Sequence, residues 1–240
     1  VEVVAILVRD ASTAAQAFPD RAPLFVSSLA ALLDTHPTLV CECAGHGAVD
    51  AYAEAALLAG VDVLLVSVGA LSDAARAQRL EAAAVQGNCQ LSLASGAIGG
   101  LDWLVSARTA GLSRVVYRGR KPPLAWSGTV AESLLNLKAL QTAEVFFRGT
   151  AREAASRFPK NANVAATVGL ASLGMDATRV ELIADPAVTD NVHEVEAISE
   201  AGTLHIRLSG KPDPLNPKTS MITAHSAVRV ILRRCDAMIV

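Results

Sequence analysis

Lys160, Asn161 and Asn163 stand at the start of a small, apolar stretch (PKNANVAATV) that predicts a buried helix. The first four backbone N–H groups of a helix have no partner within it, and with the helix dipole they attract a carboxylate or a phosphate. The lysine adds a positive charge, and the amides can pair with an amide group of a ligand. The cluster predicts an anion site. The alternative is that Asn161 only caps the helix and Lys160 is solvated.

His193 lies in the alternating segment DNVHEVE, which predicts a strand. Alternation places His193 on one face with Val195, and with Asn191 if the strand reaches back that far, so the imidazole should point toward the apolar side. Histidine can give or take a proton near neutral pH, so His193 is a candidate catalytic residue. A core histidine held by a backbone carbonyl, or a solvated strand end, is the alternative.

A second basic cluster precedes the last predicted helix, where Lys218, Thr219 and Ser220 follow an Asn-Pro pair. A lysine and two hydroxyls at a helix start predict another anion site. A dicarboxylic ligand would need two such anchors, so Lys160, Asn161, Lys218 and Thr219 are the candidate binding residues for it. A proline-defined turn with a hydroxyl cap explains the same pattern without a ligand.

The N-terminal part repeats a pattern of apolar strand, glycine turn and alanine-rich helix, which predicts βαβ units. The expected strands are 1–8, 38–43, 61–68 and 90–94. Unbroken apolar strands of this kind are buried on both faces, as in a parallel sheet. Residues 1–110 are therefore expected to form an α/β domain of the type that binds a cofactor.

Ligands of such sheets bind at the carboxyl ends of the strands, which here carry Asp10, Gly45, Gly69 and Ala97. These four are the candidate cofactor contacts. An acidic residue in the position of Asp10 accepts hydrogen bonds from ribose hydroxyls in dinucleotide folds, whereas Arg9 beside it suits a 2′-phosphate. The two residues do not decide between the two cofactor types, and a solvated strand end remains the alternative.

The C-terminal part has shorter, more alternating segments, which predict an antiparallel or mixed sheet. The expected strands are 114–117, 143–148, 179–184, 193–198 and 203–209, with helices at 161–173 and 219–233. We expect an α+β domain over 111–218. The last helix, within 219–240, can return to complete the first domain.

Composition excludes several classes of function. The net charge of −2 and the absence of a basic run argue against a nucleic-acid surface, and no apolar run reaches the roughly 18 residues that span a membrane. The start lacks the features of a signal peptide, so a reducing cytoplasm is expected. Cys41 and Cys43 have His46 nearby but no evident fourth ligand for zinc, so we expect no metal and interpret both thiols as core packing.

Four motifs together resemble the bacterial L-aspartate dehydrogenase family over nearly the whole chain: PKNANVAATV, ADP…DNVHEVEA, GKPDPLNPKTS and SVGALSD…SGAIGG. The resemblance implies a Rossmann domain, a catalytic and dimerisation role for the domain over 111–218, NAD or NADP as oxidant, a homodimer, and conversion of L-aspartate to iminoaspartate. Iminoaspartate hydrolyses to oxaloacetate and ammonia or feeds NAD biosynthesis. By position, His193 matches the family's catalytic histidine, and Ala97 and Asn163 match its NAD contacts.

The family's glycine-rich turn after the first strand is absent from this sequence, which leads us to expect a truncated record with the first strand missing from the middle of the sheet. Two other functions stay open at this point. One is a non-catalytic dimeric remnant without the phosphate loop, and the other is a related Rossmann dehydrogenase of another small acidic substrate.

Overall fold

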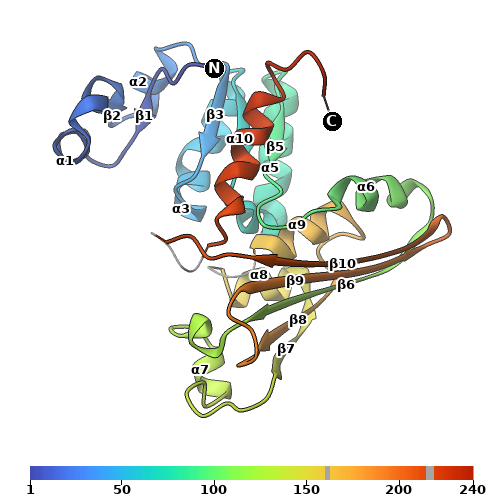
Figure 1. Cartoon of the computed structure of the whole chain (residues 1–240). Coiled ribbons are helices and arrows are strands. Elements are labelled where there is room, and N and C mark those ends of the chain that lie inside the picture. The colour runs from blue at the N-terminus through green and yellow to red at the C-terminus, as the bar shows by residue number, and fades with distance from the viewer. Residues whose placement is uncertain (160–162, 215–218, 240) are drawn as a thin grey trace.

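The computed structural model describes residues 1–159, 163–214 and 219–239. Its N-terminal part contains parallel strands with helices between them, and its C-terminal part is built on a five-stranded mixed sheet (Figure 1). This arrangement confirms the α/β class with a second, mixed-sheet part. Among the described residues no helix is long and apolar enough to cross a membrane.

The parallel strands form two separate sheets, one of order β1-β2 and one of order β3-β4-β5. The strands are β1 (Ile6–Leu7), β2 (Phe25–Val26), β3 (Leu39–Glu42), β4 (Asp62–Leu65) and β5 (Leu91–Leu93). The connecting helices are α1 (Ala11–Ala17), η1 (Pro19–Leu24), α2 (Leu29–Leu33), α3 (His46–Ala48), η2 (Val49–Ala53), α4 (Glu54–Leu58), η3 (Val68–Ser72) and α5 (Ala74–Gln86).

The predicted strand at residues 1–8 is wrong over most of its length. Only Ile6 and Leu7 pair, with Phe25 and Val26 of β2, and Val1 and Val3 are exposed. A β-branched run supplies strand propensity, but a strand needs a partner for its backbone. Among the described residues this run pairs in the ladder at two positions, with one further hydrogen bond from the Val8 N–H to the Val26 carbonyl. Strand β2 has only two residues, too few for a sequence pattern to predict it.

The five-stranded sheet has the order β10-β9-β6-β8-β7, in which β6 and β8 are parallel and the other pairs antiparallel. Its strands are β6 (Leu112–Lys121), β7 (Glu144–Thr150), β8 (Arg179–Ala184), β9 (Asn191–Ser199) and β10 (Gly202–Gly210). The helices of this part are α6 (Leu101–Thr109), η4 (Pro123–Trp126), α7 (Ala131–Leu134), α8 (Ala151–Arg157) and α9 (Asn163–Ala171).

Strand β6 runs four residues beyond the expected end at Tyr117, and the sequence analysis missed helices α6 and α8. Helix α8 is short, but a capping box fixes its start: the Thr150 hydroxyl accepts from the Glu153 N–H, and the Glu153 carboxylate accepts from the Thr150 N–H. A short alanine-rich helix has little periodicity of its own, so packing on the sheet decides its structure.

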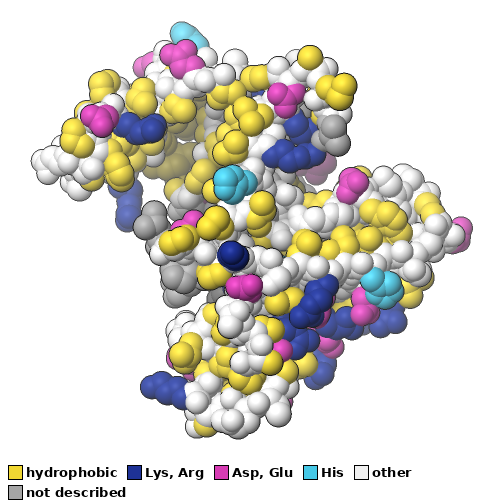
Figure 2. Space-filling view, in the orientation of Figure 1, with side chains coloured by type: hydrophobic (Ala, Val, Ile, Leu, Met, Phe, Trp, Pro, Cys, Tyr) yellow, Lys and Arg dark blue, Asp and Glu magenta, His cyan; other side chains and the backbone are white. Residues whose placement is uncertain are grey.

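One face of the mixed sheet packs against α6, α8 and α9, and the other carries charge. The core between them includes Tyr117 and Val195 from the sheet and Ala166 from α9. On the opposite face, Arg118 bonds to Glu181 and Glu196. Figure 2 shows basic and acidic side chains interspersed below β10, where this face comes to the surface.

The last helix, α10 (Ile222–Leu232), lies against the sheet β3-β4-β5 (Figure 1). Ala227 joins a small core with Leu64 of β4 and Ala94 after β5. Ser226 accepts a hydrogen bond from the Gly96 N–H at 3.0 Å, so α10 holds the turn that follows β5. The helix begins three residues later than the expected Thr219.

Ser226→Ala should destabilise the fold by about 1 kcal/mol and weaken binding of the expected cofactor, NAD, because the partly buried Gly96 N–H loses its acceptor beside Ala97. Denaturant titration and NAD titration measure the two effects. Ser133→Ala, a change on the short helix α7 far from this turn, is the matched control. Unchanged stability and NAD affinity in Ser226→Ala would contradict this account of the turn.

Candidate active site

A small pocket of about 70 Å³ lies where the parallel sheet meets the mixed sheet. Four groups of residues line it, from the β4 and β5 ends, the start of α9, the mixed sheet, and the segment entering α10. They include Ala97, Asn163, Lys121, Asn191, His193 and Thr219. Four of the sequence-predicted residues therefore share one pocket: Ala97, Asn163, His193 and Thr219.

The other predicted residues lie elsewhere or are not described. Gly69 contacts the pocket through Asn163, and Gly45 lies in the turn after β3. Asp10 lies at the N-terminus of α1 and does not line the pocket. Lys160, Asn161 and Lys218 lie outside the described residues.

The carboxylate of Asp10 caps helix α1. It accepts hydrogen bonds from the backbone and hydroxyl groups of Thr13 and Ser12, which lower its pKa to about 2. This carboxylate therefore stays charged at neutral pH. The contact of Asp10 with a ribose stays a prediction.

The turns after β3 and β4 are joined by the buried carboxylate of Glu42. It accepts hydrogen bonds from the N–H groups of Ala44 and Gly45 at 2.7 and 2.8 Å, and from the N–H and hydroxyl of Ser67 at 3.1 and 3.0 Å. Four donors satisfy a buried carboxylate, so Glu42 fixes the spacing of two turns at the ligand-binding edge. The sequence analysis missed this role, although an acidic residue inside an apolar strand was a signal for it.

Asn163 joins the start of α9 to the turn after β4. Its Oδ1 accepts a hydrogen bond from the Gly69 N–H at 3.0 Å. A Cβ on residue 69 would lie 2.5 Å from this oxygen and 3.1 Å from His46 Nε2. Glycine is therefore required for the close approach of the two elements, and Asn163 presents its NH₂ group as the donor for a ligand.

Gly69→Ala should weaken NAD binding by roughly tenfold, because the added methyl displaces the Asn163 side chain and breaks its hydrogen bond to residue 69. Gly47→Ala is the matched control, since a Cβ there meets nothing within 4 Å. The measurement is the dissociation constant of NAD by titration. Equal affinity of Gly69→Ala and the unchanged protein would refute the role given to this contact.

His193 is 4% exposed, and its Nδ1 lies 2.8 Å from the Tyr117 hydroxyl. Its Nε2 is buried and has no hydrogen-bond partner among the described residues. Burial, and then the charge of Lys121, lower the pKa of His193 to about 4, so the imidazole is neutral at physiological pH. Burial raises the pKa of Tyr117, so its phenol keeps its proton.

The register between β6 and β9 explains how tyrosine reaches histidine. Gly119 is paired with His193, and Tyr117 lies two residues earlier on the same face of β6. A Cβ on residue 119 would lie 2.8 Å from the Tyr117 hydroxyl oxygen, so only glycine leaves room for this hydroxyl. The sequence analysis ended the strand at Tyr117, and so missed both Gly119 and Lys121 as parts of the site.

Tyr117→Phe should lower turnover by about tenfold, because one buried hydrogen bond that orients the imidazole is lost. Binding of NAD should stay within about twofold, since the candidate cofactor contacts lie on other elements. Steady-state kinetics and NAD titration together measure this. A variant with full turnover would show that the tyrosine does not position His193.

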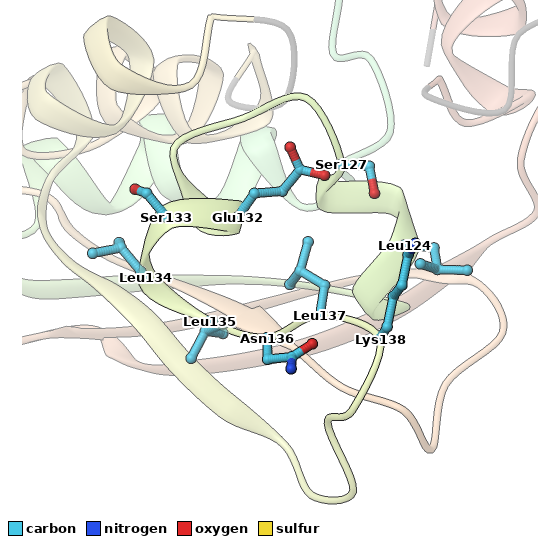
Figure 3. A pocket seen from close by; sticks show the side chains of 9 residues that line it. All are labelled: Leu124, Ser127, Glu132, Ser133, Leu134, Leu135, Asn136, Leu137 and Lys138. Carbon is cyan, nitrogen blue, oxygen red and sulfur yellow. The ribbon is translucent and has the colours of Figure 1, made fainter.

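A larger hollow, of about 480 Å³, lies between η4 and the chain around α7 (Figure 3). Leucine side chains, Glu132, Asn136 and Lys138 surround it. None of the sequence-predicted residues lines it. The smaller pocket, which holds the buried imidazole, is therefore the better candidate for chemistry.

The cysteines lie apart from the pocket. Cys43 is exposed, which corrects the interpretation of both thiols as core packing; only Cys41 packs partly against α10. The two sulfurs lie 3.5 Å apart at the end of β3. No group of three or more potential metal ligands occurs among the described residues.

A parallel-sheet part with its ligand edge against a mixed-sheet part, and a buried histidine at the join, define the class of two-part nucleotide-dependent dehydrogenases. Comparison with known families agrees with this class. The family "Aspartate dehydrogenase, C-terminal" matches residues 102–234, and "Homoserine dehydrogenase, NAD binding domain" matches residues 1–94.

The relatives with similar sequences show which family the chain belongs to. The L-aspartate dehydrogenase of Cupriavidus taiwanensis is 52% identical over 205 residues, covering 85% of this chain and 77% of the relative. That of Pseudomonas aeruginosa is 49% identical over 218 residues, covering 91% and 81%. The crystal structure of an aspartate dehydrogenase from Thermotoga maritima has a TM-score of 0.71 and 30% identity, covering 85% and 78%. The chain belongs to the L-aspartate dehydrogenase family.

Proposed function

We propose that this protein oxidises L-aspartate at its α-carbon, with NAD or NADP as the oxidant, to iminoaspartate that hydrolyses to oxaloacetate and ammonia. The observation that carries the proposal is the meeting of Ala97, Asn163 and the buried His193 in one pocket. Family membership over most of the chain supports the same reaction.

The residues at the pocket fit a nicotinamide cofactor. Gly69 and Ala97 follow two neighbouring parallel strands, β4 and β5, at the edge where such sheets bind nucleotides. The Asn163 amide donates from its NH₂ group, because its oxygen is engaged by Gly69, and this donor suits a carboxamide oxygen. When bound there, the cofactor supplies a hydride acceptor for the α-carbon of the substrate.

His193 handles a proton of the substrate amine in this proposal. The α-amine must be neutral before hydride can leave. The neutral imidazole of His193 lines the pocket, and its Nε2, which has no hydrogen-bond partner among the described residues, can accept that proton. If Nδ1 carries a proton and donates it to the Tyr117 oxygen, this hydrogen bond is present both in the neutral ring and in the imidazolium. Tyr117 therefore holds the ring in place throughout the step.

His193→Ala should lower turnover by about 10²- to 10⁴-fold, as expected for loss of a general base, and leave NAD affinity within about twofold. Stopped-flow or steady-state absorbance of the reduced cofactor measures turnover. His205→Ala, an exposed histidine on β10, is the matched control and should behave as the unchanged protein. Unchanged turnover in His193→Ala would remove the proposed role.

The reaction itself is tested with L-aspartate and either cofactor at alkaline pH. Reduction of NAD or NADP that depends on L-aspartate, with ammonia formed in equal amount, supports the proposal. Faster reduction with another small acidic amino or hydroxy acid would favour a related dehydrogenase. No reduction with any of them, together with retained NAD binding, would favour a non-catalytic protein.

Several wider expectations belong to the same proposal. One domain, residues 1–110 completed by the helix within 219–240, would bind the cofactor. The other domain, residues 111–218, would bind the substrate. A cytoplasmic homodimer that supplies iminoaspartate to NAD biosynthesis is the expected setting. Sedimentation velocity tests the dimer, and accumulation of iminoaspartate-derived product in a coupled assay tests the supply.

A further inference from the structure

Lys121, the last residue of β6, is a buried lysine at the pocket. Its side chain is 5% exposed and lines the same pocket as His193 and Asn191. The Nζ lies 5.3 Å from the centre of the Trp126 ring. That ring is fully buried and is fixed by a hydrogen bond from its Nε1 to the Ile183 carbonyl at 3.1 Å. The ammonium of Lys121 is therefore held beside the pocket.

Among the described residues, His193 on β9 lies close enough for the charge of Lys121 to act on its pKa, and its imidazole is neutral. The backbone N–H of Asp185, after β8, donates to the Lys121 carbonyl, but the Asp185 carboxylate accepts a hydrogen bond from Arg120 at 2.7 Å. Burial lowers the pKa of Lys121 to about 8, which shows that the charge is poorly solvated there.

Among the described residues that line the pocket, Lys121 has the one cationic side chain at neutral pH. The remaining polar lining is made of amides, hydroxyls and the neutral imidazole. A carboxylate that enters such a pocket is stabilised most by a charge-assisted hydrogen bond with a lysine. The lysines that the sequence analysis assigned to this role, Lys160 and Lys218, lie outside the described residues.

Resting on the proposed function, we propose that Lys121 binds one carboxylate of the substrate and selects for acidic amino acids over neutral ones. The Lys121 side chain is already buried, so little conformational entropy is lost when the ammonium meets the carboxylate. Trp126 holds the ammonium in position through its ring.

Binding of succinate, a dicarboxylate without an amine to oxidise, tests this role separately from catalysis. Isothermal titration in the presence of saturating NAD should give a succinate dissociation constant about 100-fold higher for Lys121→Met than for the unchanged protein. NAD affinity should stay within about twofold. Lys121→Arg keeps the charge and should recover at least about tenfold of the lost affinity, which separates a binding role from a folding defect.

The pH dependence gives a second readout. Lys121 must be protonated to pair with a carboxylate, so succinate binding should weaken by about tenfold per pH unit above pH 8. The dependence should disappear in Lys121→Met. Lys138→Met, which removes an exposed lysine at the larger hollow, should keep the full affinity and the full pH dependence.

Each outcome decides the proposal. Normal succinate binding by Lys121→Met would overturn it, and a simultaneous loss of turnover would then assign Lys121 to proton transfer. The proposed function fails separately, if the unchanged protein binds succinate through Lys121 but does not oxidise L-aspartate.

Discussion

The antiparallel register between β6 and β9 is the constraint on which the site depends. It places Gly119 opposite His193, and alternation brings Tyr117 and Lys121 to the same face on either side of it. A shift of β6 by one residue would turn Tyr117 and Lys121 to the charged outer face, where Arg118 and Arg120 now lie, and away from His193. The sheet therefore sets the position of the imidazole, its hydrogen-bond partner and the nearby ammonium together.

The second requirement is that the parallel strands present their ends to this face. Two hydrogen bonds hold the strand ends in this position. The Gly69 N–H donates to Asn163 of α9, and the Gly96 N–H donates to Ser226 of α10. Both helices follow the parallel sheet by many residues in the sequence. The pocket is therefore made by tertiary contacts between the two parts, and its polar groups are desolvated because buried elements surround them.

The sequence predicted the elements with strong patterns and missed those decided by tertiary packing. Alternation around His193 and the glycine turns after apolar strands placed β8, β9, β4 and Ala97 well, because a period of two and a positive-φ residue are local signals. Lys121 was missed because Arg118-Gly-Arg-Lys looks like a solvated strand end. Its burial depends on Trp126 and on helices that pack over the sheet, and no local pattern encodes that contact.

The most direct test of the account is a crystal structure of the protein with NAD and succinate. We predict that the nicotinamide lies between Ala97 and Asn163, with a succinate carboxylate on Lys121 and the succinate carbons facing His193 Nε2. Density for the dinucleotide or the dicarboxylate at the hollow around α7, with the pocket at His193 empty, would contradict the central claim that one site at the join of the two sheets holds both reactants.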